Sequence, residues 1–191
     1  MGIEAAMRVV EAAEMCASPE IVAFGIGGDE LSIATTDFRP VYQRATDIGL
    51  HRLIHAGEVG GPEKIREAIE LLGVERIGHG IAAINDPALM DLLAERQIPL
   101  EICPQSNLLT GALARQLNLP EATIEQHPLP KLFRRGIPIV LSTDDPTMFH
   151  TTLLNEYENT ARMGLSDEEL LRLTTMSFRH AFNAPDPTRT T

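Results

Sequence analysis

The stretch LIHAGEVGGPEKIREAIELLGVERIGH, residues 53–79, holds two short apolar runs separated by an amphipathic segment. Pro62 suits the first position of a helix and Gly73 can end it. Apolar residues recur between them at helical spacing, at Ile65, Ala68, Ile69 and Leu72. The apolar pairs at 53–54 and 76–77 are short, and the rhythm of the neighbouring sequence is what favours strands there. The stretch therefore predicts a β-α-β unit with parallel strands.

The same alternation of apolar runs and amphipathic segments continues on both sides of this stretch. Further strands are expected at residues 21–24, 98–102 and 137–141. Helices are expected at about 3–17, 40–48 and 147–163, after Asp86-Pro87, and after the capping box formed by Ser166 and Glu169. Five strands in this rhythm indicate either an open doubly wound sheet or part of a (βα)₈ barrel. In both folds, ligands bind at the carboxyl ends of the strands.

Composition restricts the classes of partner. The chain has 191 residues, 43% of them apolar, and a net charge of −11 with no basic cluster. Nucleic acids and acidic membranes are therefore not expected partners, because phosphate binding needs clustered Lys and Arg. No apolar stretch has the length of a membrane span, and the first residues do not resemble a signal peptide. Cys16 and Cys103 match no metal or redox spacing, so we expect a cytoplasmic protein.

Polar or flexible residues follow every expected strand. The segments are Gly28-Asp29-Glu30, His55-Ala56-Gly57-Glu58, Gly78-His79-Gly80, Cys103-Pro104-Gln105-Ser106-Asn107 and Ser142-Thr143-Asp144-Asp145. Each segment alone has an ordinary structural explanation. The glycines at 25–28 do not form a dinucleotide fingerprint, since Glu30 stands where its third glycine would be.

The single residues also have ordinary explanations. Gly28 fits a turn, His55 fits a satisfied interior histidine, and Glu58 fits the start of a helix. His79 fits a turn between two glycines, and Asp145 fits the cap of the helix expected at about 147–163.

These explanations do not predict that histidines and carboxylates share one rim of the fold. An imidazole and an aspartate are ordinary zinc ligands, and zinc lowers the pKa of its bound water toward neutrality. The residues therefore favour a metal site in which His55 binds the ion. Glu58 would remain free to transfer a proton.

The five segments, in this order and spacing, resemble the strand-end motifs of the adenosine deaminase family. That family is a branch of the metal-dependent amidohydrolases and has a (βα)₈ barrel. The resemblance runs from about residue 5 to 183. It implies an α/β fold, a partial (βα)₈ TIM-type barrel made of about the last five βα units. The barrel domain would span residues 1–183 and be followed by a tail at 184–191.

The resemblance also implies a cofactor and the roles of individual residues. His55 and Asp144 would be ligands of Zn²⁺. Glu58 would protonate N1 of a purine ring, and His79 would orient and help activate the zinc-bound hydroxide that attacks C6. Asp145 would assist that attack and contact N7. The carbon–nitrogen bond at C6 would then break to release ammonia.

The implied substrate is a 6-aminopurine nucleoside. The backbone N–H of Gly28 would contact N3, and adenosine would become inosine. Adenine or a modified adenine nucleoside, such as aminodeoxyfutalosine, are alternatives. The zinc deaminases of the cytidine type are excluded, because Cys103-Pro104 has no second cysteine nearby.

The chain departs from the family pattern in one respect. The family draws two more zinc ligands from a His-x-His motif at its first strand, and no two histidines here are two residues apart. The six are His51, His55, His79, His127, His150 and His180. We therefore expect an enzyme whose site is incomplete as this chain, with a non-catalytic remnant or interaction module as the alternative. Strands 21–24 and 137–141 would be unpaired edges, so self-association is also expected.

Overall fold

Five parallel strands form one sheet in the computed structural model, which describes residues 2–32 and 34–183. The strands are β1 (Ala23–Ile26), β2 (His51–Ala56), β3 (Arg76–His79), β4 (Leu100–Ile102) and β5 (Ile139–Leu141). Their spatial order is their order in the chain. A doubly wound sheet reverses its strand order at a switch point, whereas a barrel keeps the order of the chain. The sheet is therefore part of a barrel, as predicted.

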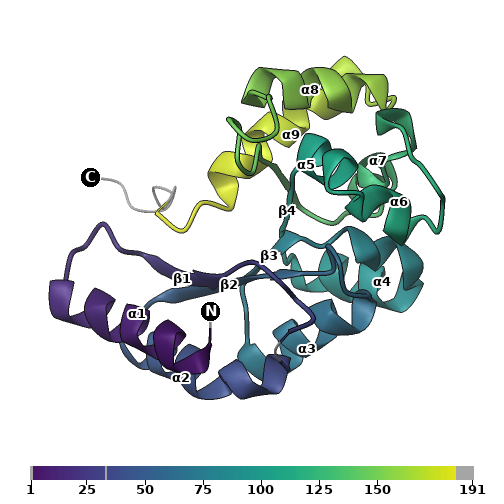
Figure 1. Cartoon of the computed structure of the whole chain (residues 1–191). Helices are drawn as coiled ribbons and strands as arrows, with labels where there is room; N and C mark the ends of the chain where they lie inside the picture. Colours follow the sequence, from purple (N-terminus) through teal and green to yellow (C-terminus); the bar gives the residue numbers. More distant parts are fainter. Residues whose placement is uncertain (1, 33, 184–191) are drawn as a thin grey trace, which may run out of the picture.

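Helices alternate with the strands along the chain (Figure 1). They are α1 (Ile3–Cys16), α2 (Arg39–Asp47), α3 (Pro62–Leu72), α4 (Pro87–Arg96), α5 (Pro104–Leu109), α6 (Ala112–Gln116), α7 (Leu129–Arg134), α8 (Leu153–Arg162) and α9 (Asp167–Arg179). Short 3₁₀ turns occupy Thr35–Phe38, Ile81–Asn85 and Ile124–Gln126. Figure 1 shows α1, α2 and α3 beside β1 and β2, with α8 and α9 at the other end of the sheet.

The helix signals read from the sequence are confirmed. In α3, Pro62 stands in the first turn and Gly73 takes the left-handed conformation at φ 60°, and the four predicted core residues are all buried. The Asp86 side chain accepts the N–H of Leu89 at 2.9 Å and caps α4. Ser166 and Glu169 form the predicted capping box of α9. These signals fix where each βα unit turns.

The segment after β5 differs from the prediction. The helix expected at about 147–163 begins only at Leu153, because His150 has a positive φ of 48° and Thr152 is extended. Thr152 caps α8 by accepting the N–H of Asn155 at 3.2 Å. As a consequence, Asp145 does not cap that helix.

Several other bounds also differ. The short helices α5, α6 and α7 had no counterpart in the prediction. β1 begins two residues later than the expected strand at 21–24. The tail predicted at 184–191 lies outside the described residues.

The sheet has two edge strands, each paired with one neighbouring strand. Within the described residues, β1 pairs only with β2 and β5 only with β4. Ile77 on β3, Leu100 on β4 and Ile139 on β5 are fully buried. Among residues 2–32 and 34–183, no helix is long and apolar enough to cross a membrane.

Candidate active site

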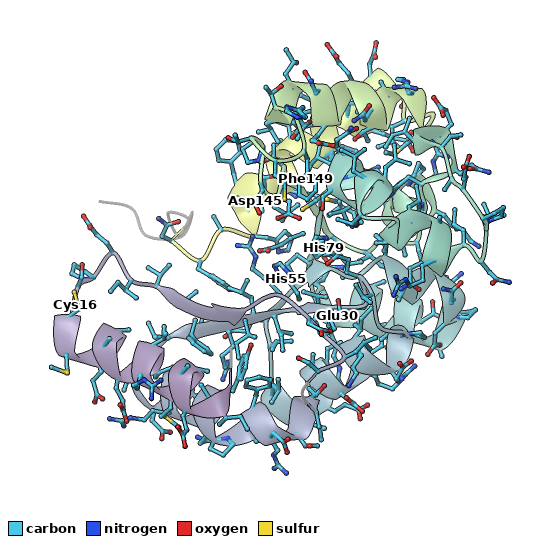
Figure 2. All side chains as sticks on the ribbon, viewed as in Figure 1. Cys16, Glu30, His55, His79, Asp145 and Phe149 are labelled. Atoms are coloured by element: carbon cyan, nitrogen blue, oxygen red, sulfur yellow. The ribbon has the colours of Figure 1, made fainter. Side chains whose placement is uncertain are left out.

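The predicted site residues meet at the carboxyl edge of the sheet. His55 on β2 is paired in register with Gly78 on β3, and Ala56 with His79. The two imidazole rings lie 4.7 Å apart, centroid to centroid, at 85° (Figure 2). Glycine makes room for His55, because a Cβ at Gly78 would lie 2.5 Å from its Cδ2 and one at Gly27 would lie 2.9 Å from its Cε1. The glycines that read as turn residues therefore accommodate an imidazole between three strands.

His79 stands at the centre of the cluster. Its side chain is 3% exposed, and its Nε2 lies 3.5 Å from Glu58 Oε2 and 3.9 Å from Asp144 Oδ2. His79 and Asp144 both have positive φ, at 61° and 57°. Non-glycine residues in that region are strained, and such strain concentrates at functional sites. Burial lowers the pKa of His79 and of His55, so both imidazoles favour the neutral form.

Glu58 is a mostly buried carboxyl group whose pKa is raised. Its side chain is 13% exposed. Burial raises its pKa, and the nearby negative charge of Glu30 raises it further. The Thr110 hydroxyl lies 3.4 Å from Glu58 Oε1, a weak hydrogen bond that opposes this shift. A raised pKa favours the protonated form of a carboxyl group at higher pH than usual, which suits a residue that donates a proton.

Glu30 holds the loop that carries Glu58. Its carboxylate accepts the backbone N–H groups of Gly57, Glu58 and Gly60 at 3.0, 2.8 and 2.8 Å, and that of Val59 more weakly at 3.4 Å. The carbonyls of the same loop accept hydrogen bonds from the Gln116 amide, at Glu58 (2.9 Å) and Gly60 (2.8 Å). The sequence prediction missed this role of Glu30. The signal was the glycine-rich run at 57–61, whose free N–H groups need an acceptor.

Asp144 is oriented by a buried hydroxyl. Ser106 is fully buried, and its Oγ donates to Asp144 Oδ2 at 2.7 Å. The neighbouring Asp145 is exposed in the turn after β5, and its side chain makes no hydrogen bond or ion pair within the described part of the chain. Gly28, with φ 111°, borders a cavity of about 120 Å³ that His55 also lines. The structure thus gathers His55, Glu58, His79 and Asp144, and leaves Asp145 and Gly28 at the periphery.

The donor set fits a zinc ion in its chemistry. Two groups of ligand atoms lie within 4.8 Å of one another: His55, Glu58 and His79 form one, and His79, Cys103 and Asp144 form the other. Burial raises the pKa of the Cys103 thiol to about 12, so without a bound ion the thiol is protonated. Neither ring nitrogen of His55 has a hydrogen-bond partner in the described residues. Imidazole and carboxylate are the ligands that hydrolytic zinc sites use.

A buried polar chain that the sequence did not reveal ends on His79. Asn107 Nδ2 lies 3.1 Å from His79 Nδ1, and His127 Nε2 lies 3.3 Å from Asn107 Oδ1. The backbone N–H of Leu129 donates to His127 Nδ1 at 3.1 Å. One strand, β4, lies between His79 and His127 in the chain, and nothing near His127 in the sequence had marked it.

Fold and site together define a class of protein. A parallel sheet in chain order, with histidines and carboxylates gathered at its carboxyl edge, is characteristic of (βα)₈ barrel proteins. The model of the adenosine deaminase family matches residues 2–190, and the chain belongs to this family.

Curated relatives divide among three substrates. The chain is 42% identical to the aminodeoxyfutalosine deaminase of Streptomyces coelicolor, over 88% of this chain and 42% of that protein. It is 42% identical to an adenosine deaminase of Klebsiella pneumoniae, over 87% and 48%. It is 35% identical to an adenine deaminase of Sinorhizobium fredii, over 99% and 56%. The chain spans about half the length of these relatives.

Solved structures agree with the fold. The adenine deaminase of Arthrobacter aurescens superposes with a TM-score of 0.83 at 31% identity, covering 95% of this chain and 53% of that one. An amidohydrolase from Burkholderia ambifaria, solved with bound Zn, gives 0.86 at 25% identity, covering 98% and 50%. Arabidopsis ADAL in complex with IMP gives 0.81 at 30%, covering 95% and 51%. The five strands thus correspond to about half of such a barrel.

Proposed function

We propose that this chain supplies the proton-donating part of a zinc-dependent aminohydrolase site that converts a 6-aminopurine nucleoside, adenosine first, to its 6-oxo product and ammonia. The observation that carries the proposal is Glu58, a carboxyl group of raised pKa held 3.5 Å from the imidazole of His79. Membership of the adenosine deaminase family supports the reaction class. The barrel half at residues 1–183 is the unit we assign to it.

His55 and Asp144 are the residues that would hold the metal. The ring nitrogens of His55 have no hydrogen-bond partner among the described residues. The hydrogen bond from Ser106 orients the Asp144 carboxylate, as outer-shell groups do for metal ligands. The zinc found in the Burkholderia ambifaria amidohydrolase supports this choice of ion. When bound, zinc would lower the pKa of a water molecule toward neutrality.

The side chains of this half have distinct tasks in the proposed reaction. Glu58 donates its proton to N1 of the purine, which makes C6 more electrophilic. His79 orients the attacking water, and Asp145, which lies exposed after β5 in this structure, would assist the attack. The water oxygen bonds to C6 and gives up both of its protons, one to the exocyclic nitrogen and one that restores Glu58. The bond from C6 to the exocyclic nitrogen then breaks, and the nitrogen leaves as ammonia. The backbone N–H of Gly28, at the border of the cavity, would contact N3.

Within this reaction class, we propose adenosine as the substrate to test first. Identity to the aminodeoxyfutalosine and adenosine deaminases is equal, at 42%, so sequence similarity does not rank these two substrates. All three relatives' substrates share a 6-aminopurine, and Glu58, His79 and Asp145 are proposed to act on that shared ring. Adenosine is therefore the first substrate to test, with adenine and aminodeoxyfutalosine beside it.

The test measures zinc content and deamination together. The chain would be assayed by itself and joined to the amino-terminal strands of the Klebsiella pneumoniae adenosine deaminase. We expect the joined form to bind zinc stoichiometrically and to form inosine from adenosine. A folded, zinc-loaded joined form that deaminates none of the three substrates would refute the proposal and favour a non-catalytic remnant. As a control, Glu58→Gln in the joined form should keep zinc and lose turnover.

A further inference from the structure

The buried hydrogen bonds that link Leu129, His127, Asn107 and His79 all donate in one direction, toward His79. The backbone N–H of Leu129 can only donate, and it points at His127 Nδ1 from 3.1 Å. A neutral imidazole carries one N–H, so the proton of His127 must be on Nε2. Burial lowers the pKa of His127 to about 3, which keeps the ring neutral. The backbone N–H of Leu129 therefore fixes the direction of donation, because it cannot act as an acceptor.

That direction passes through the side-chain amide of Asn107. The Nε2–H of His127 donates to Asn107 Oδ1 at 3.3 Å, which turns the Asn107 NH₂ group toward His79 Nδ1 at 3.1 Å. If the amide were flipped, its NH₂ would face the Nε2–H of His127, donor against donor. Asn107 is fully buried and His127 is 3% exposed, so water does not relieve such a mismatch.

The last hydrogen bond of the series determines which ring nitrogen of His79 bears the proton. Because His79 Nδ1 accepts from Asn107, the neutral ring carries its hydrogen on Nε2. That nitrogen faces the carboxyl groups of Glu58 and Asp144, at 3.5 and 3.9 Å. An N–H at this position is the donor that orients an attacking oxygen or pairs with a carboxylate.

We propose that Asn107 and His127 are positioning residues that hold neutral His79 as its Nε2–H tautomer, directed into the candidate active site. The proposal rests on the proposed function only for its kinetic consequence, since the tautomer itself is a property of the folded chain. Neither residue approaches the reacting atoms in this arrangement. They act through His79.

The test reads the tautomer directly. Magic-angle-spinning ¹⁵N spectra of the ¹⁵N-histidine-labelled chain distinguish protonated from unprotonated ring nitrogens, whether or not the chain associates. The signals of His79 are identified by their loss in His79→Gln. We expect an unprotonated Nδ1 and a protonated Nε2. If the unsubstituted chain shows His79 with its proton on Nδ1, the proposal is wrong, whatever the deaminase assay gives.

Substitutions of similar shape separate positioning from packing. Asn107→Asp presents only acceptors and should move the His79 proton to Nδ1. His127→Gln keeps an N–H for Asn107 and should retain the Nε2–H tautomer. His127→Asn keeps only the acceptor for Leu129 and should give a mixture of tautomers. Thr160→Val, at a fully buried hydroxyl that bonds the Glu156 carbonyl, controls for loss of a core hydrogen bond and should leave His79 unchanged.

Kinetics of the joined barrel then test the consequence. Asn107→Asp should lower kcat by about 10²-fold or more with little change in KM, the scale of a lost acid–base or orienting contribution. His127→Gln should keep most of the activity that His127→Asn loses. Equal kcat in Asn107→Asp and the unsubstituted protein would overturn the positioning role. Absence of activity in the unsubstituted protein would refute the proposed function and leave the spectra to decide the tautomer.

Discussion

Acidification should destabilise the chain through His127. The residue is 3% exposed, and burial lowers its pKa from 6.5 to about 3. As the pH falls below 6.5, the unfolded chain takes up a proton at this position and the folded chain does not. The stability that neutral His127 provides is therefore complete above pH 6.5 and is lost as the pH falls toward 3.

The size of the effect follows from the two pKa values. Linkage gives a loss in the free energy of unfolding of about 0.8 kcal/mol at pH 6 and about 2 kcal/mol at pH 5, relative to high pH. His127→Gln removes the titrating group and keeps an N–H for Asn107. The variant should be less stable than the unsubstituted chain at pH 7, and the gap between them should narrow by about 2 kcal/mol at pH 5.

Urea unfolding at pH 7, 6 and 5, followed by circular dichroism at low protein concentration, measures this gap. Other groups with shifted pKa, such as His55 and Glu58, are present in both proteins and cancel in the difference. A gap that stays constant between pH 7 and pH 5 would refute the reasoning, because it would mean that His127 titrates alike in the folded and unfolded chains.

Three further results are expected. In the joined barrel, His55→Ala should lose zinc and activity together, whereas Glu58→Gln should keep zinc and lose at least about 10²-fold in turnover, as metal analysis and initial rates would show; near-normal turnover of Glu58→Gln would exclude it as the acid. Glu30→Gln replaces an acceptor oxygen by a donor and should weaken the 57–60 loop by about 2–4 kcal/mol, which speeds hydrogen exchange of the loop amides by about 30- to 800-fold; unchanged exchange would contradict the role given to its carboxylate. The 191-residue chain alone should associate through the edges at β1 and β5; a monodisperse monomer in light scattering would show that these edges are protected.

The sequence was informative wherever local chemistry decides structure. Pro62, Gly73 and the Ser166–Glu169 box act through bonds within their own turn, so they mark the same positions in any fold. The rhythm of apolar runs predicted five parallel strands. It left the doubly wound alternative open, because strand order is decided by packing between distant segments.

The residues of the candidate site also fall into two groups, those that the sequence predicted and those that it missed. His55, Glu58, His79 and Asp144 were predictable because each lies at or just after the carboxyl end of a strand, and parallel strands bring these ends to one edge. Glu30, Asn107 and His127 act through hydrogen bonds to residues at least 20 positions away in the chain. Their partners depend on how the loops fold over the sheet, and no spacing in the sequence encodes that. The late start of α8 was missed for a similar reason, since a positive φ at His150 leaves no mark on an apolar pattern.

The order of the strands has a consequence for how the polypeptide folds during synthesis. Each strand after β1 in the described sheet pairs with the strand just before it in the chain, so each new βα unit finds its pairing strand already formed. Loop closure then involves only the short connection inside one unit, which keeps its entropic cost small. Such topologies can assemble stepwise from the amino-terminal side as the ribosome releases them. The most recently added strand remains the growing end at every stage, and it is the part of the nascent chain most exposed to capture by chaperones or by other chains.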